Sequence, residues 1–348
     1  MPSMFFLSAN RVKGMWGRRL LILLAVLLVA PVASFLLVRG VLALANWQLE
    51  RRFPPPGQMI ALDNHRVHLF CQGANAPTVV IEPGLGVDWV AWAPVILDLA
   101  RSVEVCVYDR AGYGWSEAGP MPRTAERSAA DLHQLLASSH HRGPYVLVAH
   151  SFGGYIARIY ASRYPDRLGG VVLVDPAERE PGDIARAPEK AMGSLWSLSG
   201  LTDRLPPLGW ERVKRLQRGE EALSPDVRKL PVAFRHRVVI ASSLDQLAAE
   251  WSELESVQAS QVQARAAAFP RDVPLTVITP LYSSGRGTAS AIPTSETRRE
   301  LHRKLAETST LGAQVFAGQS GHMVQVDQPD LVATTIRGVL ARVRQERQ

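Results

Sequence analysis

Short runs of branched apolar residues recur along the chain, and most precede a stretch whose apolar residues are three to four positions apart. The run Val146-Leu147-Val148, for example, leads into a segment in which Ile156, Ile159 and Tyr160 share one helical face. Strands buried on both faces give such runs, and amphipathic helices give this spacing. The alternation predicts a doubly wound, mostly parallel α/β sheet with helices between the strands.

The expected elements can be placed by residue range. Strands are predicted at 58–62, 66–71, 77–82, 103–108, 145–149, 168–174, 274–279 and 313–317. The first two flank Asp63-Asn64 and are predicted to form a hairpin. Helices are predicted at 87–100, 124–138, from Gly154 onward, at 296–307 and from Leu331 onward. These elements define a core made of residues 58–176 and 271–348.

The alternation stops between residues 177 and 270. The early part of this segment is rich in Pro, Arg and Leu, and a helical pattern runs from about Leu244 to Phe269. We interpret residues 177–270 as a cap, or lid, inserted between two core strands. Its apolar residues, Trp196 among them, either line a substrate-binding site or pack the cap onto the core, and the sequence leaves both interpretations open.

The N-terminal part has the pattern of a membrane anchor. Leu20 to Val38 is a run of 19 residues without a charge, about 28 Å long as a helix and close to the thickness of a bilayer core. Four basic residues precede it, which predicts a cytoplasmic N-terminus and an exported domain. The resulting division is a basic segment at 1–19, an anchor at 20–45 and an interfacial, Pro-rich linker at 46–57. A cleaved signal peptide is the alternative, because Ala43-Leu44-Ala45 resembles a cleavage site.

The charge distribution excludes one class of function. Of the net charge of +7, residues 1–52 carry +6, because seven basic residues face Glu50 alone. The remaining chain is almost neutral, whereas nucleic-acid binding needs a basic face on the folded domain. We therefore expect no nucleic-acid partner. The expected location is the cytoplasmic membrane, with a single pass and the globular domain on the extracytoplasmic side.

The candidate nucleophile is Ser151, which falls on the predicted turn between the strand at 145–149 and the helix that follows. A nucleophile elbow places a serine hydroxyl on such a sharp turn and needs small neighbours. Gly153 and Gly154 supply them on one side, and Ala149 stands where the first glycine of G-x-S-x-G is usual. The alternative is a serine that only caps a helix.

A serine nucleophile needs a base and an acid that orients the base. His322 lies in a loop of small residues directly after the last predicted strand, at the same sheet edge as Ser151. Asp175 ends the strand expected beside the Ser151 strand, and it is the predicted acid; its alternative role is to begin an Asp-Pro turn. The strand at 274–279 ends without a carboxylate, and Glu296 is the weaker candidate for the acid.

Donors for an oxyanion are expected from two backbone N–H groups. One is that of Phe152, just after the nucleophile, and the other is that of Leu85, after the strand at 77–82. Gly84 and Gly86 flank Leu85 and allow its backbone to approach the site closely. Gly84 is therefore also predicted to lie against the substrate. This chemistry uses no cofactor and no metal.

These motifs together resemble the α/β-hydrolase superfamily. The resemblance rests on Pro83-Gly84-Leu85-Gly86, on the segment Tyr108–Ser116, on His150–Gly154, on Val174-Asp175-Pro176 and on Ser320-Gly321-His322. It covers about residues 58–345 in the right order. It implies an eight-stranded sheet with its second strand antiparallel and a cap after the sixth. Members with an aspartate nucleophile are disfavoured by Ser151.

The two cysteines, Cys71 and Cys106, lie in predicted strands, and their spacing fits no metal site. Two buried free thiols are the default expectation. The resemblance places their strands next to each other, and an exported domain permits a disulfide. Both states stay open at this point.

Three functions remain. The leading hypothesis is a membrane-anchored serine hydrolase that cleaves a carboxylic ester, either small or lipid-like, through an acyl-enzyme. An acyltransferase or an amidase using the same three residues is the alternative. A binding protein on an inactive hydrolase scaffold is the third. The sequence leaves the oligomeric state open.

Overall fold

The computed structural model describes three parts of the chain. These are residues 29–178 except positions 31, 35, 38, 39, 42 and 46, residues 217–282 except 242, and residues 295–345. Most of the predicted anchor at Leu20–Val38, and Trp196 with the early part of the predicted cap, lie outside the described residues.

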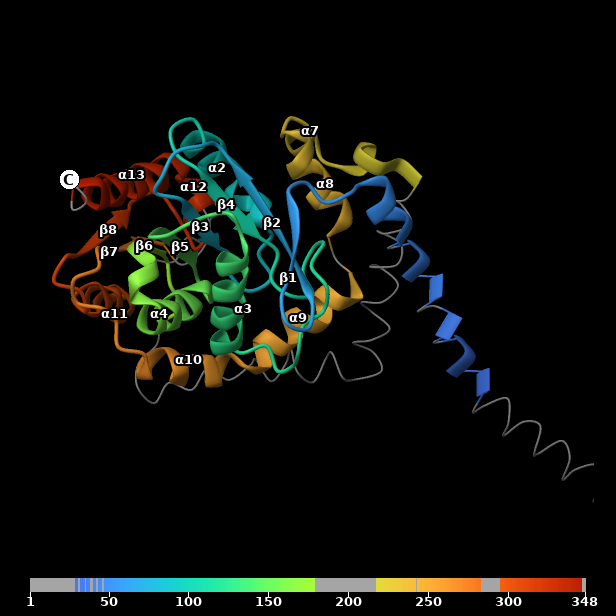
Figure 1. Ribbon diagram of the computed structural model, residues 1–348, viewed down its shortest axis with the longest axis horizontal. Coiled ribbons are helices and arrows are strands. Elements are labelled where there is room, and N and C mark those ends of the chain that lie inside the picture. Colours follow the sequence, from blue (N-terminus) through green and yellow to red (C-terminus); the bar gives the residue numbers. More distant parts are fainter. Residues whose placement is uncertain are drawn as a thin grey trace, which may run out of the picture.

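The centre of the molecule is an eight-stranded sheet in the order β1-β2-β4-β3-β5-β6-β7-β8 (Figure 1). The strands are β1 Gln58–Ala61, β2 Arg66–Gln72, β3 Val79–Glu82, β4 Val105–Tyr108, β5 Tyr145–His150, β6 Leu168–Val174, β7 Leu275–Pro280 and β8 Gly312–Ala317. Strand β2 is antiparallel to β1 and β4, and every other pair is parallel. The predicted sheet is therefore confirmed, including the antiparallel second strand.

Both faces of the sheet are buried, which explains the continuous apolar runs. In β5, Val146 and Val148 belong to the core on one face, whereas Leu147 and Ala149 belong to the core on the other. Successive side chains of a strand point to opposite faces, so a strand covered on both sides must be apolar throughout.

Helices from consecutive crossovers cover the two faces. The core on one face includes buried residues of α2 Ala93–Leu99 and α13 Pro329–Gln345. The core on the other includes those of α3 Ala125–Ser138, α4 Gly153–Arg163, α10 Val257–Ala266 and α11 Glu296–Ala306. Figure 1 shows α3 and α4 side by side on this second face, with α10 beside them. Shorter helices at Trp89–Trp92 and α12 Val324–Asp327 complete the first layer.

The described part of the predicted cap is helical. It comprises a short helix at Gly219–Ala222, α7 Pro225–Arg228, α8 Val232–Ile240, α9 Leu244–Glu255 and α10. Ser243 caps α9 by accepting a hydrogen bond from the Gln246 N–H, which satisfies one of the free donors at the helix start. The prediction of a helical segment from about Leu244 to Phe269 is confirmed as two helices that meet near Ser256.

The described residues between 29 and 52 form a helix that extends away from the domain on the side of α7 and α8 (Figure 1). Leu49 and Phe53 are buried, and the Trp115 Nε1–H donates a hydrogen bond of 3.0 Å to the Phe53 carbonyl. Larger apolar side chains beyond this point are exposed: Val29, Val32, Leu36, Leu37, Val41, Leu44 and Trp47. Among the described residues, no helix is both long and apolar enough to span a bilayer.

Cys71 and Cys106 form a disulfide. They lie directly opposite each other in the antiparallel pair of β2 and β4. The alternative of two free thiols, the default from the sequence, is wrong. The register of β2 against β4 brings the two sulfurs together. The positions of the two strands along the sequence do not reveal this register.

Removing this disulfide should lower the free energy of unfolding. The bond closes a loop over a sequence separation of 35, so its loss from a Cys71→Ala/Cys106→Ala variant should cost about 3 to 4 kcal/mol through the larger entropy of the unfolded chain. Urea denaturation measures the difference, and reduced wild type is the matched control with unchanged side chains. Two free thiols in the denatured, unreduced protein would contradict the bond itself.

Candidate active site

Ser151 lies on the turn between β5 and α4, where the sequence predicts it. Its φ is +52°, a left-handed conformation that is costly for a residue with a side chain. Three hydrogen bonds hold the turn: the Ser151 N–H donates to the Val174 carbonyl, and the Ser151 carbonyl accepts from the N–H groups of Gly154 and Ala177. A strained conformation persists when its surroundings fix it in this way, and the strain exposes the side chain at the sheet edge.

The loop after β3 packs tightly against this turn. A Cβ on Gly84 would lie 2.8 Å from His150 Nδ1 and 3.2 Å from Ser151 Cβ. A Cβ on Gly153 would lie 2.7 Å from the Glu82 carbonyl oxygen. Glycine is therefore required at both positions for steric reasons. Ala149 stands where the first glycine is usual, and its methyl group is buried in the core on the α4 face.

His322 follows β8 and faces Ser151. Its Nε2 is 3.1 Å from Ser151 Oγ, and its Nδ1 is 2.6 Å from Asp175 Oδ2. A carboxylate can only accept, so Nδ1 carries the proton and Nε2 presents a lone pair to the serine hydroxyl. The structure thus brings together all three residues that the sequence predicts. The His322 side chain is 40% exposed, whereas that of Asp175 is fully buried.

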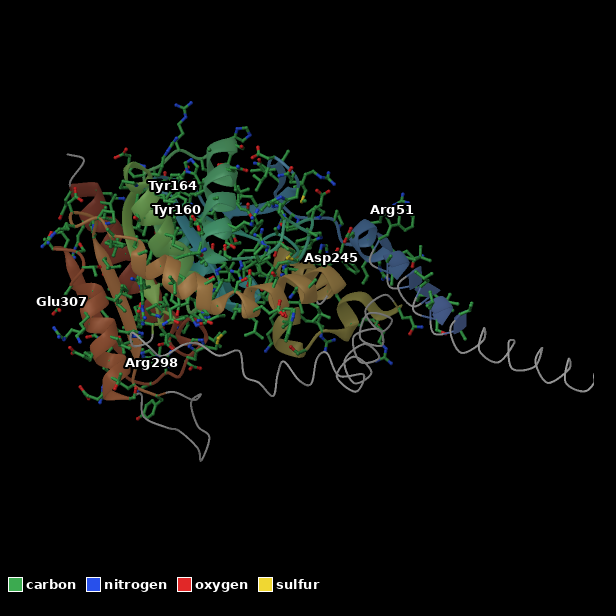
Figure 2. All side chains as sticks on the ribbon, turned by 90° about the horizontal axis from the view of Figure 1, so that it is seen from below. Arg51, Tyr160, Tyr164, Asp245, Arg298 and Glu307 are labelled. Carbon is green, nitrogen blue, oxygen red and sulfur yellow. A yellow bond between two sulfur atoms is a disulfide. The ribbon has the colours of Figure 1, made fainter. Side chains whose placement is uncertain are left out.

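Asp175 is held by the next strand and by a helix from far along the chain. Its N–H donates to the Ile278 carbonyl of β7, and its side chain is fully buried. The Arg298 Nη2 of α11 donates a hydrogen bond of 2.8 Å to Oδ2, the oxygen that also contacts His322. A buried carboxylate without such partners would be strongly unfavourable. Figure 2 shows Arg298 in the half of the domain far from Arg51.

The weaker candidate for the acid lies elsewhere. Glu296 begins α11, where its side chain is 84% exposed and pairs with Arg299. Its helix does contribute to the site, but through Arg298 and His302. The sequence predicted neither Arg298 nor His302 as part of the site. No local pattern distinguishes these two residues from others on an amphipathic helix.

His302 and His150 are buried, neutral histidines that orient the groups around the site. The ring of His302 contacts the Pro176 carbonyl at 3.1 Å and Thr279 Oγ1 at 3.0 Å, and burial lowers its pKa to about 4. His150 Nε2 contacts the His322 carbonyl at 2.9 Å, and burial lowers the pKa of His150 to about 3. His150 thus packs beneath the elbow and contacts the loop that carries His322.

The two expected oxyanion donors lie in suitable places. Phe152 immediately precedes α4, so its N–H lies at the positive end of the helix dipole. Leu85 follows Gly84, and a Cβ on Gly84 would lie 3.2 Å from Ser151 Cβ. Among the hydrogen bonds of the described residues, none uses the N–H of Leu85 or of Phe152. Both donors are thus available to a ligand oxygen.

One group of three potential metal ligands occurs in the part of the chain that the structure describes. It consists of Cys71, Cys106 and His141. Two of these residues are joined as a disulfide, and β2 and β4 carry them away from the loops that hold Ser151 and His322.

Comparisons with known proteins agree with the fold described above. The family profile described as "alpha/beta hydrolase fold" matches residues 77–206. "Esterase Rv0045c" of Mycobacterium tuberculosis is 26% identical over 284 residues, which cover 77% of this chain and 84% of the esterase. The crystal structure of a putative lipase (lip1) from Acinetobacter baumannii AYE has a TM-score of 0.61 at 17% identity, covering 88% of this chain and 97% of the lipase.

A third relative matches over a shorter stretch. "Uncharacterized protein YqjL" of Bacillus subtilis is 32% identical over 119 residues, which cover 34% of this chain and 47% of that relative. The match thus spans about half the length of YqjL. Together with the sheet topology, these comparisons show the α/β-hydrolase fold, which is the fold of the superfamily that the sequence motifs resemble.

The neutral state of His302 predicts how stability depends on pH. Because its pKa is about 4 in the folded chain and 6.5 ordinarily, the unfolded chain binds more protons between these values. The free energy of unfolding should therefore fall as the pH drops from 6.5 towards 4, by up to about 3 kcal/mol for this residue. Urea denaturation across this window should give a flatter pH dependence for His302→Gln than for wild type.

The exposed His140 provides the control for this prediction. His140→Gln should keep the wild-type slope, because it removes an exposed histidine and leaves the buried contacts of His302 unchanged. Equal slopes for wild type and His302→Gln would show that His302 is not held in its neutral form.

Proposed function

We propose that this protein is a hydrolase that cleaves carboxylic esters, with Ser151 as the nucleophile, His322 as the general base and Asp175 as the acid that orients it. The observation that carries the proposal is the continuous hydrogen-bond series from Asp175 Oδ2 through His322 to Ser151 Oγ, with distances of 2.6 and 3.1 Å. A serine hydroxyl is a weak nucleophile until a base within this reach accepts its proton, and a third group must orient the base.

The reaction follows from these positions. His322 Nε2 takes the hydroxyl proton while Ser151 Oγ bonds to the ester carbonyl carbon, and the negative charge moves to the carbonyl oxygen. The N–H groups of Leu85 and Phe152 stabilise that oxygen. His322 then gives the proton to the leaving alcohol, which leaves an acyl-enzyme on Ser151. A water molecule, activated by His322 in the same way, releases the acid and restores the serine.

Arg298 and Asp175 have different roles beside His322. The imidazolium that forms during the reaction is stabilised by the Asp175 carboxylate, and Arg298 keeps that carboxylate in place through the same oxygen. The role of Asp175 is therefore to orient His322 and to stabilise the imidazolium.

The similarity to an esterase supports a carboxylic ester as the substrate, and the similarity to a putative lipase supports a lipid-like one. The proposed cap at 177–270 would form part of the binding site, with helices α8, α9 and α10 as its described portion. The approach of Glu250 to Gly86 supports this placement: a Cβ on Gly86 would lie 3.8 Å from Glu250 Cδ. Helix α9 thus lies beside the loop that carries Leu85.

We further propose that the chain is anchored in the cytoplasmic membrane, with its catalytic domain on the extracytoplasmic side. The row of exposed apolar side chains on the helix at 29–52 supports a lipid-facing segment. Arg51 lies over the Trp47 ring, 4.7 Å from its centroid, an amphipathic pair suited to a bilayer interface. The disulfide supports an oxidising compartment, because such bonds are rare in the cytosol.

Loss of the nucleophile should abolish turnover. Ser151→Ala removes the bond-forming oxygen and should lower kcat on the order of a million-fold. Asp175→Asn favours the wrong tautomer of His322 and should lower kcat about 10⁴-fold. Steady-state kinetics on p-nitrophenyl esters measures both, and circular dichroism establishes that each variant is folded. Ester hydrolysis by folded Ser151→Ala at the wild-type rate would exclude Ser151 as the nucleophile.

The anchor should decide where the activity is found. Full-length chain should fractionate with membranes, and salt should not extract it, because burial of apolar surface rather than charge holds it there. A chain that starts at Trp47 keeps the buried Leu49 and Phe53 and should be soluble and active. Both are assayed on esters of increasing acyl length. Soluble full-length chain with a processed N-terminus near residue 46 would instead establish a signal peptide.

A further inference from the structure

Arg110 is a buried arginine whose five N–H groups all have partners. Its Nε and Nη2 donate to the two carboxylate oxygens of Glu253, at 2.7 and 2.9 Å. Its Nη1 donates to Glu82 Oε1 and to the Pro83 carbonyl, both at 2.7 Å, and its Nη2 also donates to the Gly84 carbonyl at 3.0 Å. The five donors of a guanidinium are thereby satisfied in its rigid plane.

Two of these acceptors belong to the loop that carries an oxyanion donor. The Gly84–Leu85 peptide bond is trans, because it is not among the cis bonds of the described residues. In a trans peptide the C=O and the following N–H point in opposite directions within one plane. The Gly84 carbonyl accepts from Arg110 Nη2 and, at 3.2 Å, from the Val87 N–H within the turn, so these two donors together direct the Leu85 N–H away from Arg110. Gly84 also packs directly against Ser151.

The next peptide group of the loop is fixed by the same cluster. The Gly86 N–H contacts Tyr113 Oη at 3.3 Å, and the Tyr113 hydroxyl donates to Glu253 Oε2 at 2.8 Å. The Pro83 carbonyl, the Gly84 carbonyl and the Gly86 N–H each have a hydrogen-bond partner in this cluster. The Leu85 N–H is left for a ligand. The cluster thus selects which N–H group of the loop is available.

Half of this arrangement comes from the proposed cap. Glu82 ends β3, whereas Glu253 lies on α9, 143 positions from Arg110 in sequence. One cation faces two buried carboxylates, and burial raises the pKa of Glu82 to about 7. Tyr108 also donates a hydrogen bond to Glu82. The bidentate partner of Arg110, however, is Glu253, so the orientation of the guanidinium depends on where α9 docks.

We propose that Arg110 and Glu253 are positioning residues that orient the Leu85 N–H for the developing oxyanion, so that docking of α9 on the core completes the site. This inference rests on the proposed ester hydrolysis. It differs from a purely structural role, because it requires that the loss of these residues weakens binding of an oxyanion more than binding of the neutral substrate.

Arg237 offers a matched control. It is also a buried arginine that joins a cap helix to the core, through 2.7 Å to Asp109 and 2.8 Å to Asp88. Its ion pairs hold α8 to the core, and among the described residues it makes no hydrogen bond with a carbonyl of the loop at 83–86. A variant of Arg237 therefore tests general loss of cap packing without a direct change at the Leu85 peptide.

The experiment uses full-length Arg110→Lys, Glu253→Gln and Arg237→Lys beside wild type. Each is assayed for kcat and KM on a p-nitrophenyl ester and for inhibition by a trifluoromethyl ketone with the same acyl chain. Ser151 Oγ adds to the ketone carbon, its proton passes to His322, and the ketone oxygen becomes an oxyanion at the Leu85 and Phe152 N–H groups. The ketone therefore reports oxyanion stabilisation without turnover.

Arg110→Lys and Glu253→Gln should weaken both kcat/KM and ketone affinity in parallel, by about 10- to 100-fold, with KM changed less than about threefold; removal of a whole donor costs about 10² to 10³. Arg237→Lys should change the ketone affinity less than about threefold. Thermal melts establish folding, and Glu253→Gln, which keeps the side-chain shape, decides the matter if Arg110→Lys does not fold.

Two results would overturn the inference on its own: wild-type ketone affinity in folded Glu253→Gln, or an equal loss of affinity in Arg237→Lys. If wild type neither hydrolyses esters nor binds the ketone, the proposed function fails, and the inference fails with it. The behaviour of wild type therefore distinguishes the two failures.

Discussion

The close packing of the loop after β3 against the turn that carries Ser151 is the constraint on which the site depends. Gly84 leaves space for His150 and for the Ser151 side chain, and Gly153 leaves space for the Glu82 carbonyl. Because neither contact accepts a methyl group, glycine is required at both positions for the two segments to pack this closely, and hydrogen bonds of the turn hold Ser151 at a positive φ. The groups that complete the site are arranged around this pair of segments.

The sheet topology brings the three residues of the proposed triad to one edge of the sheet. The strands β5, β6 and β8 are mutually parallel in the sheet, so their carboxyl ends, which lead to Ser151, Asp175 and the His322 loop, lie at one edge. Parallel strands alone place such residues only approximately. Hydrogen bonds reduce the remaining freedom: His150 contacts the His322 carbonyl, and Arg298 contacts Asp175. These are side-chain contacts between elements that are distant in sequence.

The sequence predicted those parts of the structure that local pattern determines. The eight strands follow from apolar runs, and the elbow follows from a strand, a serine and two glycines in succession. Asp175 was predicted from its place at a strand end, although the strand differs from the usual one. The structure supports Asp175 rather than Glu296 as the proposed acid, because Asp175 contacts His322 whereas the Glu296 side chain is exposed.

The residues that the sequence did not predict share one property, which is that their partners are far apart along the chain. Arg110 and Glu253 are separated by 143 positions and Arg298 and Asp175 by 123. A charged residue in a helical pattern usually faces solvent, so nothing in the pattern indicates that Glu253 is buried. The disulfide also depends on a contact between separate elements. The pairing of β2 with β4 determines it, and the spacing of the two cysteines along the sequence does not.

The central claim is that Ser151 is the reactive nucleophile of this enzyme, and labelling tests it most directly. Wild-type protein is treated with a fluorophosphonate, digested, and the modified residue is identified by mass spectrometry. The account predicts one phosphonyl group per chain, attached to Ser151, with slower labelling in His322→Ala because the base is lost. An adduct on a different residue, or folded wild type that does not react, would contradict it.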